Sequence, residues 1–322
     1  MGCILVTGIG GNVGQGILRN IRSFDPNLRL IGTDVRPVTG GNYLCDEVHQ
    51  TPVASAPNFA AAIKKICRKS GVQLIIPSTD VEGYHLSLNT KELPTLAFPV
   101  PATNMMFWDK YSTWQHFTKN KIPFAESCLP SEWKGQFKKY IVKPKRGQGS
   151  KNLHFNPPNV KEFSDATFVV QNLYEGEEIT TAFYVTKKRK MHGSITFRRQ
   201  LQTGFTAICE VTHDFDKRLF SIMNAMAEIF EIAGACNIQS IALPDGRIYP
   251  FEINGRISGT NSIRSQFGFK DVQYTVEEYL LGKDPSPVHI TPGCAARVLL
   301  DVIFPGQSLS EVKNKNSRFY IY

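Results

Sequence analysis

Apolar residues recur along the first hundred positions of the chain in two alternating patterns. Short apolar runs within residues 4–8, 28–34 and 73–79 predict buried strands. Between these runs, apolar residues spaced three and four positions apart predict amphipathic helices over residues 12–24 and 58–70. Strands that alternate with helices usually form a parallel sheet covered on both faces, so this region predicts an α/β domain.

The pattern changes after a proline-rich stretch at residues 92–104, which indicates a domain boundary. One helix is predicted over residues 104–120, and β-rich sequence with turn signals follows over residues 138–211. A long helix over residues 216–233 then precedes two strands joined by the turn Pro-Asp-Gly-Arg at 244–247. The chain is therefore expected to be α/β at its start and α+β overall.

Composition and charge exclude several classes of protein. The 322 residues are 42% hydrophobic and 20% charged, as in ordinary globular proteins, and no apolar run is long enough to cross a membrane. The net charge of +9 is spread over short basic clusters in turn-like contexts, so we expect anionic small ligands and no nucleic acid. The seven cysteines are scattered, without a C-x-x-C pair, and no secretory signal precedes them, which indicates reduced thiols in a cytoplasmic protein.

The first glycine-rich stretch, Thr7 to Gly14, spells T-G-x-x-G-x-x-G between a predicted strand and a predicted helix. This spelling is typical of extended short-chain reductases that bind NAD(P), and Asp34 ends the next strand where an acid could hold a ribose. Such an enzyme also needs a Tyr-x-x-x-Lys pair on a helix. The two pairs in this chain, beginning at Tyr184 and Tyr279, fall in a predicted turn and at a predicted helix end, and Val13 stands where strict G-x-G-x-x-G has its third glycine. A tight strand-to-helix turn therefore explains these glycines better.

The second glycine-rich stretch, residues 143–150, reads KPKRGQGS and follows another predicted strand. Lys143 ends the strand, and the glycines free the following loop so that its N–H groups, with Ser150, can surround an anion. No Walker A spelling is present, and by itself the stretch also fits a basic hairpin turn.

Polar side chains on the last two predicted strands indicate a metal site. Glu252 and Asn254 alternate with apolar residues and therefore project from one strand face, and Gln239 lies on the partner strand. Three oxygen-bearing side chains on one sheet face suit Mg²⁺, which completes its shell with phosphate oxygens and water. Arg256 lies two residues beyond Asn254 on the same face, directed at those phosphates.

The chain resembles ATP-grasp enzymes of the carbamoyl phosphate synthetase, biotin carboxylase and D-alanine ligase superfamily. The matching elements follow one another in the order of that family over about residues 105–270. Its first domain resembles their Rossmann-like pre-ATP-grasp domain. The resemblance implies three parts: a Rossmann-like domain at 1–104, a linker helix and small lobe at 105–170, and a C-terminal lobe of the two-lobed ATP-grasp domain at 171–322.

The resemblance also implies site residues. For ATP, it implies Lys110, Lys143, Gly147, Gly149 and Ser150 at the phosphates, a hinge at Gln171, Asn172 and Tyr174, and Glu178 at the ribose. For Mg²⁺, with Mn²⁺ as an alternative metal, it implies Gln239, Glu252 and Asn254. Arg256 and Lys143 are the expected catalytic cations, and Arg198 is expected to reach a phosphate or the substrate carboxylate. Two departures are Gly255, where the family's E-x-N-P-R has proline, and Gln171, where glutamate is common.

The activity implied is that of a ligase, which converts a carboxylate into an acylphosphate and joins it to an amine. Asp80 and Glu82 are candidates to hold the amine, and Gly259, Thr260 and Arg264 to orient the carboxylate, although the last three also fit a helix cap. The expected partners are small molecules, and related enzymes are often homodimers. The alternatives left open are the NAD(P)-dependent reductase and a non-catalytic nucleotide-binding subunit.

Overall fold

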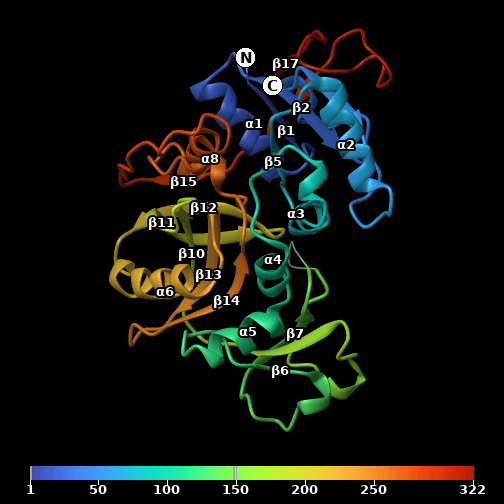
Figure 1. Cartoon of the computed structure of the whole chain (residues 1–322). Helices are drawn as coiled ribbons and strands as arrows, with labels where there is room; N and C mark the ends of the chain where they lie inside the picture. The colour runs from blue at the N-terminus through green and yellow to red at the C-terminus, as the bar shows by residue number, and fades with distance from the viewer. Residues whose placement is uncertain (1, 148, 150) are drawn as a thin grey trace.

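A parallel five-stranded sheet forms the first part of the chain in the computed structural model, which describes residues 2–147, 149 and 151–322 (Figure 1). Its strand order is β3-β2-β1-β4-β5, and all its pairings are parallel. The strands are β1 (Cys3–Val6), β2 (Arg29–Asp34), β3 (Glu47–Gln50), β4 (Leu74–Ile76) and β5 (Thr95–Leu96). The edge strands β3 and β5 lack a buried apolar run, which is why the sequence pattern did not predict them.

Helices cover both faces of this sheet, as the sequence predicts. They are α1 (Asn12–Phe24), α2 (Phe59–Ser70) and α3 (Asp80–Ser87), with short 3₁₀ turns at Asn42–Leu44 and Thr90–Glu92. Ile17 and Ile21 of α1 join a core that continues into the C-terminal lobe, whereas Ile63 of α2 packs on the opposite face. The first part and the C-terminal lobe therefore share one hydrophobic core.

The single helix predicted over residues 104–120 is wrong, because two helices occupy this region: α4 (Pro101–Trp108) and α5 (Lys110–Lys119). Asp109 between them is extended, with φ −94° and ψ 106°, and its carboxylate accepts hydrogen bonds from the N–H groups of Tyr111 and Ser112. This N-cap begins a new helix and makes Lys110 its first residue.

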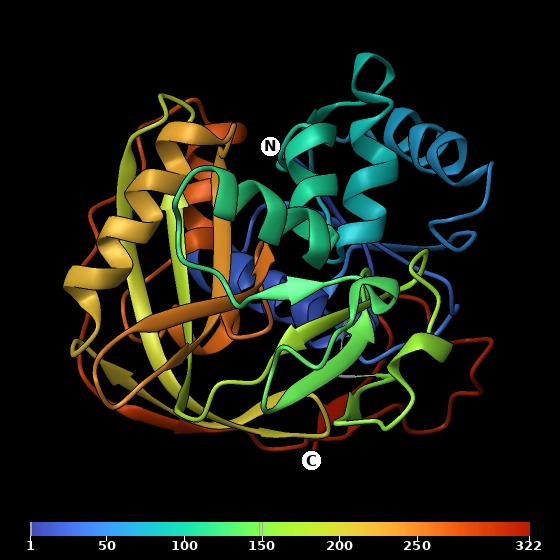
Figure 2. The same cartoon turned by 90° about the horizontal axis from the view of Figure 1, so that it is seen from below.

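A four-stranded antiparallel sheet forms the small lobe, in the order β6-β9-β7-β8 (Figure 2). Its strands are β6 (Ser127–Cys128), β7 (Tyr140–Pro144), β8 (His154–Phe155) and β9 (Phe168–Asn172), with 3₁₀ turns at Pro130–Glu132 and Val160–Glu162. Lys143 is the fourth residue of β7, which leads directly into the second glycine-rich stretch.

The C-terminal lobe is a six-stranded antiparallel sheet in the order β14-β13-β10-β11-β12-β15. Its strands are β10 (Glu177–Val185), β11 (Met191–Gln202), β12 (Phe205–Thr212), β13 (Gly234–Ala242), β14 (Ile248–Asn254) and β15 (Cys294–Ala296). α6 (Asp216–Ile229) packs on one face, and α8 (Asp271–Tyr279) packs on the other. The short helix α7 (Asn261–Arg264) follows β14, and the end of the chain pairs β16 (Val302–Ile303) with β17 (Tyr320–Ile321).

One face of this sheet changes character along its length. Ala182 and Tyr184 of β10 and Phe197 of β11 lie in the core shared with the first part. Two to four residues earlier on β10, on the same face, stand Glu178 and Thr180. The sheet therefore serves as hydrophobic core at one end and as the floor of a polar cleft at the other.

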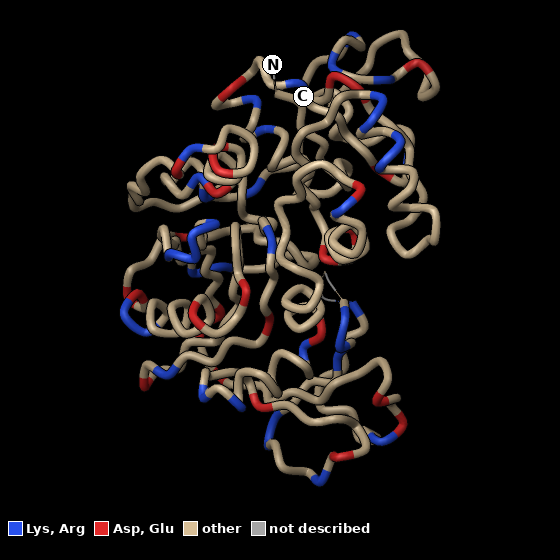
Figure 3. The backbone as a smooth tube through the Cα atoms, viewed as in Figure 1, with Lys and Arg blue, Asp and Glu red and all other residues tan. Residues whose placement is uncertain are grey.

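Acidic and basic residues are interspersed along the chain, as Figure 3 shows. Several cations of the basic clusters have structural partners: Arg146 pairs with Asp109, Lys188 pairs with Asp284, and Arg189 donates to carbonyls at the end of α6. Among the described residues, no helix is long and apolar enough to cross a membrane. The α/β first domain followed by a two-lobed second region confirms the predicted fold class.

Candidate functional site

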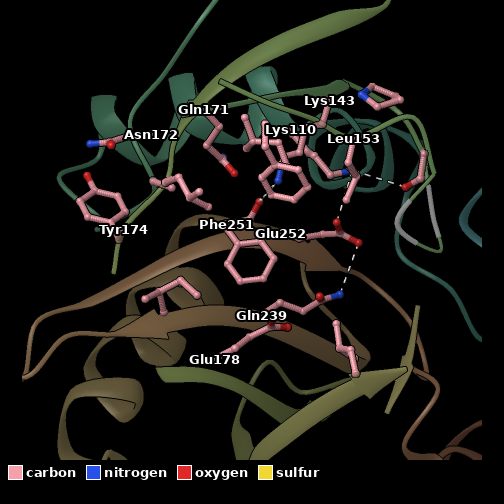
Figure 4. A pocket seen from close by; sticks show the side chains of 18 of the residues that line it. Lys110, Lys143, Leu153, Gln171, Asn172, Tyr174, Glu178, Gln239, Phe251 and Glu252 are labelled. Atoms are coloured by element: carbon pink, nitrogen blue, oxygen red, sulfur yellow. Dashed lines mark hydrogen bonds and ion pairs between the residues drawn. The ribbon is translucent and has the colours of Figure 1, made fainter. Parts of the chain in front are cut away.

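A cavity of about 340 Å³ lies between the small-lobe sheet and the C-terminal sheet. Its lining residues come mainly from β7, β9, β10, β11, β13 and β14, together with Lys110 of α5, Phe155 of β8 and the loops between the strands. Figure 4 shows the side chains that project into it. The residues expected to bind a nucleotide are therefore brought together, although they lie up to 142 positions apart in sequence, from Lys110 to Glu252.

One end of this cavity is formed by the segment that follows β9. The Tyr174 and Tyr249 rings stack in parallel, with 4.0 Å between centroids and 2° between planes. Asn172 lines the cavity, and the buried Gln171 donates from Nε2 to the hydroxyl of Ser127 at 3.2 Å. A flat aromatic surface at the end of a cavity is well suited to a planar ring such as adenine.

The other end of the cavity carries two buried lysines. Lys110 Nζ lies 3.4 Å from Glu252 Oε2 and 3.4 Å from the carbonyl of Gly147, which it donates to. Lys143 Nζ donates to the carbonyl of Phe251 at 3.4 Å and lies 5.2 Å from the centroid of that ring. Two cations beside one carboxylate leave an excess of positive charge, which suits a polyphosphate. Gly149 also lines this cavity, whereas Ser150 lies outside the described residues.

The pKa values at this end reflect that excess. Burial and, to a lesser extent, the nearby charge of Lys110 together lower the pKa of Lys143 to about 7, against the opposing effect of Glu252 and Glu178. Burial opposes ionisation of Glu252, but Lys110 and Lys143 outweigh it and hold the pKa of Glu252 below its ordinary value. Glu252 is thus ionised at neutral pH, while Lys143 is poised to gain a proton when an anion arrives.

The lowered pKa of Lys143 predicts how the stability of the free protein depends on pH. Between a folded-state pKa of about 7 and the ordinary lysine value of about 10.4, the unfolded chain binds more protons than the folded one. The contribution of Lys143 to stability should therefore rise with pH across this window, by at most about 1.4 kcal/mol per pH unit. Urea unfolding from pH 6.5 to 9.5 should show this rise, relative to Lys143→Met, which lacks it.

Lys145→Met is the matched control for this measurement, because Lys145 follows the same strand without lining this cavity. It should keep the pH dependence of the unsubstituted protein. Equal slopes for the unsubstituted protein and Lys143→Met would contradict the lowered pKa.

The three expected metal ligands converge beside the lysines. Gln239 and Glu252 are directly paired across β13 and β14, and the Gln239 amide nitrogen lies 3.4 Å from Glu252 Oε1 and 3.3 Å from Asn254 Oδ1. The Asn254 amide nitrogen lies 3.3 Å from the same Glu252 oxygen. One carboxylate beside two amide groups suits Mg²⁺, a hard cation that takes its remaining ligands from phosphate and water, once the amide oxygens of Gln239 and Asn254 exchange their present donors for the metal. No cluster of three His, Cys, Asp or Glu side chains occurs in the described part of the chain.

Arg199 is a cavity residue that sequence reasoning missed. It donates to Glu178 Oε1 from Nε at 3.0 Å and to Gln239 Oε1 from Nη2 at 2.6 Å. Arg198, which we expected at the phosphates, instead pairs with Glu177 and Asp214 on the opposite face of β11. The strand pattern contained the signal: Ile195 and Phe197 are apolar and inward-facing, so the next inward residue is Arg199.

A second cavity, of about 430 Å³, adjoins the first and reaches the first domain. The glycine-rich turn after β1 lines it with Gly8 and Gly11, and β2 contributes Asp34. Ser78 and Thr79, after β4, complete that wall. The two cavities share six residues: Gly149, Lys151, Arg199, Gly204, Gln239 and Glu252. The glycines of the first glycine-rich stretch therefore face the second cavity and not the cavity whose residues are expected to bind the nucleotide.

Two of the five expected substrate residues, Gly259 and Thr260, line the second cavity. Asp80 forms a buried ion pair with Arg256, so the expected contact with a substrate amine does not fit its position. Arg264 is fully buried, where it donates to Ser258 and Thr260 and pairs with Asp271. Its expected contact with a substrate carboxylate is therefore also wrong.

Glu82 is held in a network of hydroxyl groups. Its Oε2 accepts from Thr7 at 2.8 Å, from Thr79 at 2.7 Å and from Ser78 at 3.3 Å. Burial raises the pKa of Glu82, and the three hydroxyl groups act in the opposite direction. Because its contacts are all within the first domain, Glu82 serves the turn that begins α3, and the expected role in holding an amine does not fit it.

The tyrosine–lysine pairs of a reductase are not assembled. Tyr184 is buried and donates to Glu278 Oε2 at 2.9 Å, whereas Lys188 pairs with Asp284 in an exposed turn. The second pair begins at Tyr279, the last residue of α8, which lines neither cavity. No proton-transfer site of that class is therefore formed by these residues.

Two family models match the chain in the order of its domains. Residues 107–260 match the ATP-grasp domain, and residues 4–99 match the PylC-like N-terminal domain. No curated protein matches the chain.

Solved structures with the same fold are numerous. N5-carboxyaminoimidazole synthetase from Staphylococcus aureus, complexed with ADP, has a TM-score of 0.77 at 12% identity and covers 92% of this chain and 82% of its own. The biotin carboxylase domain of 2-oxoglutarate carboxylase from Hydrogenobacter thermophilus, a dimer with MgADP, has a TM-score of 0.72 at 14% identity, and the match covers 90% of this chain and 73% of that one. L-amino acid ligase from Bacillus licheniformis has a TM-score of 0.70 at 10% identity, and the match covers 89% of this chain and 74% of that one. At these identities the likeness shows the fold.

Proposed function

The chain belongs to the ATP-grasp superfamily, and we propose that it is an ATP- and Mg²⁺-dependent ligase that joins a carboxylate to an amine. One observation carries the proposal. Lys110, Lys143 and the Gln239–Glu252–Asn254 set meet where the two cavities join, so that phosphates bound in the first cavity face a substrate bound in the second.

The nucleotide would lie in the first cavity. Tyr174 and the backbone after β9 would hold the adenine, and Glu178 would accept hydrogen bonds from the ribose. Lys110 and Lys143 would neutralise the phosphates, with Gly147 and Gly149 allowing the loop to approach them closely. Mg²⁺ held by Gln239, Glu252 and Asn254 would supply further neutralisation of phosphate charge.

The second cavity would hold the two small-molecule substrates. Its lining side chains are mostly hydroxyl and amide groups, with Val13 and Phe205 as apolar exceptions, so polar substrates fit it. A carboxylate oxygen bonds to the terminal phosphorus as ADP leaves, giving an acylphosphate. An amine then attacks the carbonyl carbon, loses a proton and expels phosphate. Arg199 and Arg256, which both line this cavity, would stabilise the negative charge that develops.

The named neighbours support this class of reaction: one is a carboxyaminoimidazole synthetase and another an amino acid ligase. We extend the proposal to a homodimer, since the related biotin carboxylase domain is described as a dimer. We also propose a cytoplasmic location, because the seven cysteines are free thiols, six of them buried.

Ligand-dependent thermal unfolding tests the proposal. Mg-ATP at about 100 times its Kd should stabilise the protein by about 2.7 kcal/mol, raising Tm by several degrees, and NADPH should not. ADP release should then be measured over a panel of amino acids supplied as carboxylate and amine. Stabilisation by NADPH but not by Mg-ATP would refute the ligase and favour the reductase. Binding of Mg-ATP without ADP release over the panel would favour a non-catalytic subunit.

A further inference from the structure

An ion pair links the first domain to the residue that directly follows the metal set. Arg256 lies two positions beyond Asn254, and its Nε and Nη2 contact Asp80 Oδ2 at 2.9 and 2.7 Å. Asp80 is the first residue of α3, 176 positions away. Both side chains are less than a tenth exposed, so the pair is shielded from water and its geometry is fixed.

The contacts of Arg256 leave part of its guanidinium for a ligand. An arginine has five N–H donors in a rigid planar arrangement. Nε and Nη2 each use one on Asp80, and Nη1 uses one on the carbonyl of Ile257 at 3.1 Å. Two N–H groups have no partner among the residues that the structure describes, and Arg256 lines the second cavity. The side chain is therefore held in place on one side while the other remains able to bind an anion.

The surroundings of the pair hold both partners rigidly. Thr79 caps α3 by accepting a hydrogen bond from Glu82 N, which fixes the backbone at Asp80. On the other side, Gly255 packs so closely that an added Cβ would lie 3.2 Å from Pro99 and 3.3 Å from Phe107. Gly255, a departure from the family's proline, therefore stands in a tightly packed and not a loose segment.

We propose that Asp80 is a positioning residue, which orients Arg256 toward the terminal phosphoryl group of the nucleotide. This role rests on the proposed function, since it requires a nucleotide whose last phosphate reaches the junction of the two cavities. It makes the first domain part of the phosphate-handling machinery, although none of the residues described for that domain, Asp80 included, lines the nucleotide cavity.

Two simpler roles for the pair predict different behaviour. If Asp80 only masked the charge of Arg256, its removal would strengthen the binding of a triphosphate, because a full positive charge would be released. If the pair only held the domains together, its removal would weaken diphosphate and triphosphate binding equally. A positioning role instead requires a selective loss for the ligand that carries the third phosphate.

Equilibrium binding of two probes to the full chain separates these roles. Mg-ADP and the non-hydrolysable Mg-AMPPNP should be titrated into the unsubstituted protein, Asp80→Asn, Asp80→Glu, Arg256→Met and the double variant Asp80→Asn/Arg256→Met. We expect Asp80→Asn to weaken AMPPNP binding about tenfold while ADP binding changes less than twofold. Asp80→Glu should recover part of the loss. In the Arg256→Met background, Asp80→Asn should have no further effect, because Asp80 acts through the arginine.

Three results would overturn the proposal: tighter AMPPNP binding in Asp80→Asn, an equal loss for both nucleotides, or an equally large AMPPNP loss when Arg256 is already methionine. If Asp80→Asn does not fold, Asp80→Glu serves in its place, since moving the carboxylate by one methylene must also reduce AMPPNP binding selectively. Absence of binding of both nucleotides to the unsubstituted protein would instead refute the proposed function, and this role of Asp80 with it.

Discussion

Replacing Glu252 by glutamine is expected to lower ADP formation about 10³-fold, with little change in the fold. Glu252 is the one carboxylate among the proposed metal ligands, and it also faces Lys110 and Lys143. Glutamine preserves the shape of the side chain but removes the charge that attracts the metal. The measurement is steady-state ADP release with Mg-ATP, together with Mn²⁺ affinity from electron paramagnetic resonance, which should fall as well.

Glu210→Gln is the control for this change, because Glu210 lies on the same C-terminal sheet, exposed and outside both cavities. It should leave ADP release within twofold of the unsubstituted protein. Turnover retained in Glu252→Gln would show that the metal is held elsewhere. Loss of turnover with unchanged Mn²⁺ affinity would show that Glu252 acts through its contacts with Lys110 and Lys143 and does not hold the metal.

Replacing Lys110 by methionine is expected to reduce ADP formation about 10²- to 10³-fold. Lys110 contacts Glu252 and the carbonyl of Gly147, so its loss removes a phosphate cation and also a tie to the start of the glycine-rich loop. Methionine keeps most of the volume of the buried side chain, so the expected loss is in phosphate binding and not in packing. Both the Kd for Mg-ATP and kcat should change, and nucleotide titration with initial-rate kinetics measures them.

Lys119→Met, an exposed change on the same helix, is the matched control and should have no effect on either quantity. A second consequence distinguishes the charge of Lys110 from its bulk. Lys110 is the main group that lowers the pKa of Glu252, so Lys110→Met should raise that pKa and shift the acid limb of the activity profile to higher pH. An unchanged acid limb would contradict this coupling.

Most of the fold follows from local patterns. The helices over residues 12–24 and 58–70 agree with α1 and α2 because each has one apolar stripe directed at a sheet. The edge strands β3 and β5 were missed because short, half-exposed strands carry no such stripe. The break between α4 and α5 depends on the extended backbone of Asp109, which the continuous apolar spacing on either side conceals.

The candidate site was predictable where the residues belong to adjacent strands. Gln239, Glu252 and Asn254 meet because one turn pairs their strands, and periodicity alone places them on one face. The same reasoning could have predicted Arg199, because it lies on the same face of its strand as Ile195 and Phe197. The pairing of Arg256 with Asp80 could not be predicted in this way, because it depends on how two sheets far apart in the sequence pack against each other.

The proposed nucleotide and the proposed substrates occupy different cavities, and this separation predicts what happens when the first domain is exchanged for that of another protein. Of the two cavities, the described residues of the first domain line the second alone, so grafting another protein's first domain onto residues 105–322 should alter which carboxylate or amine is used while leaving nucleotide use intact. Such a chimaera must nevertheless carry a carboxylate at the start of its third helix. Without it, the hybrid would combine a complete nucleotide site with an arginine that has lost its orientation.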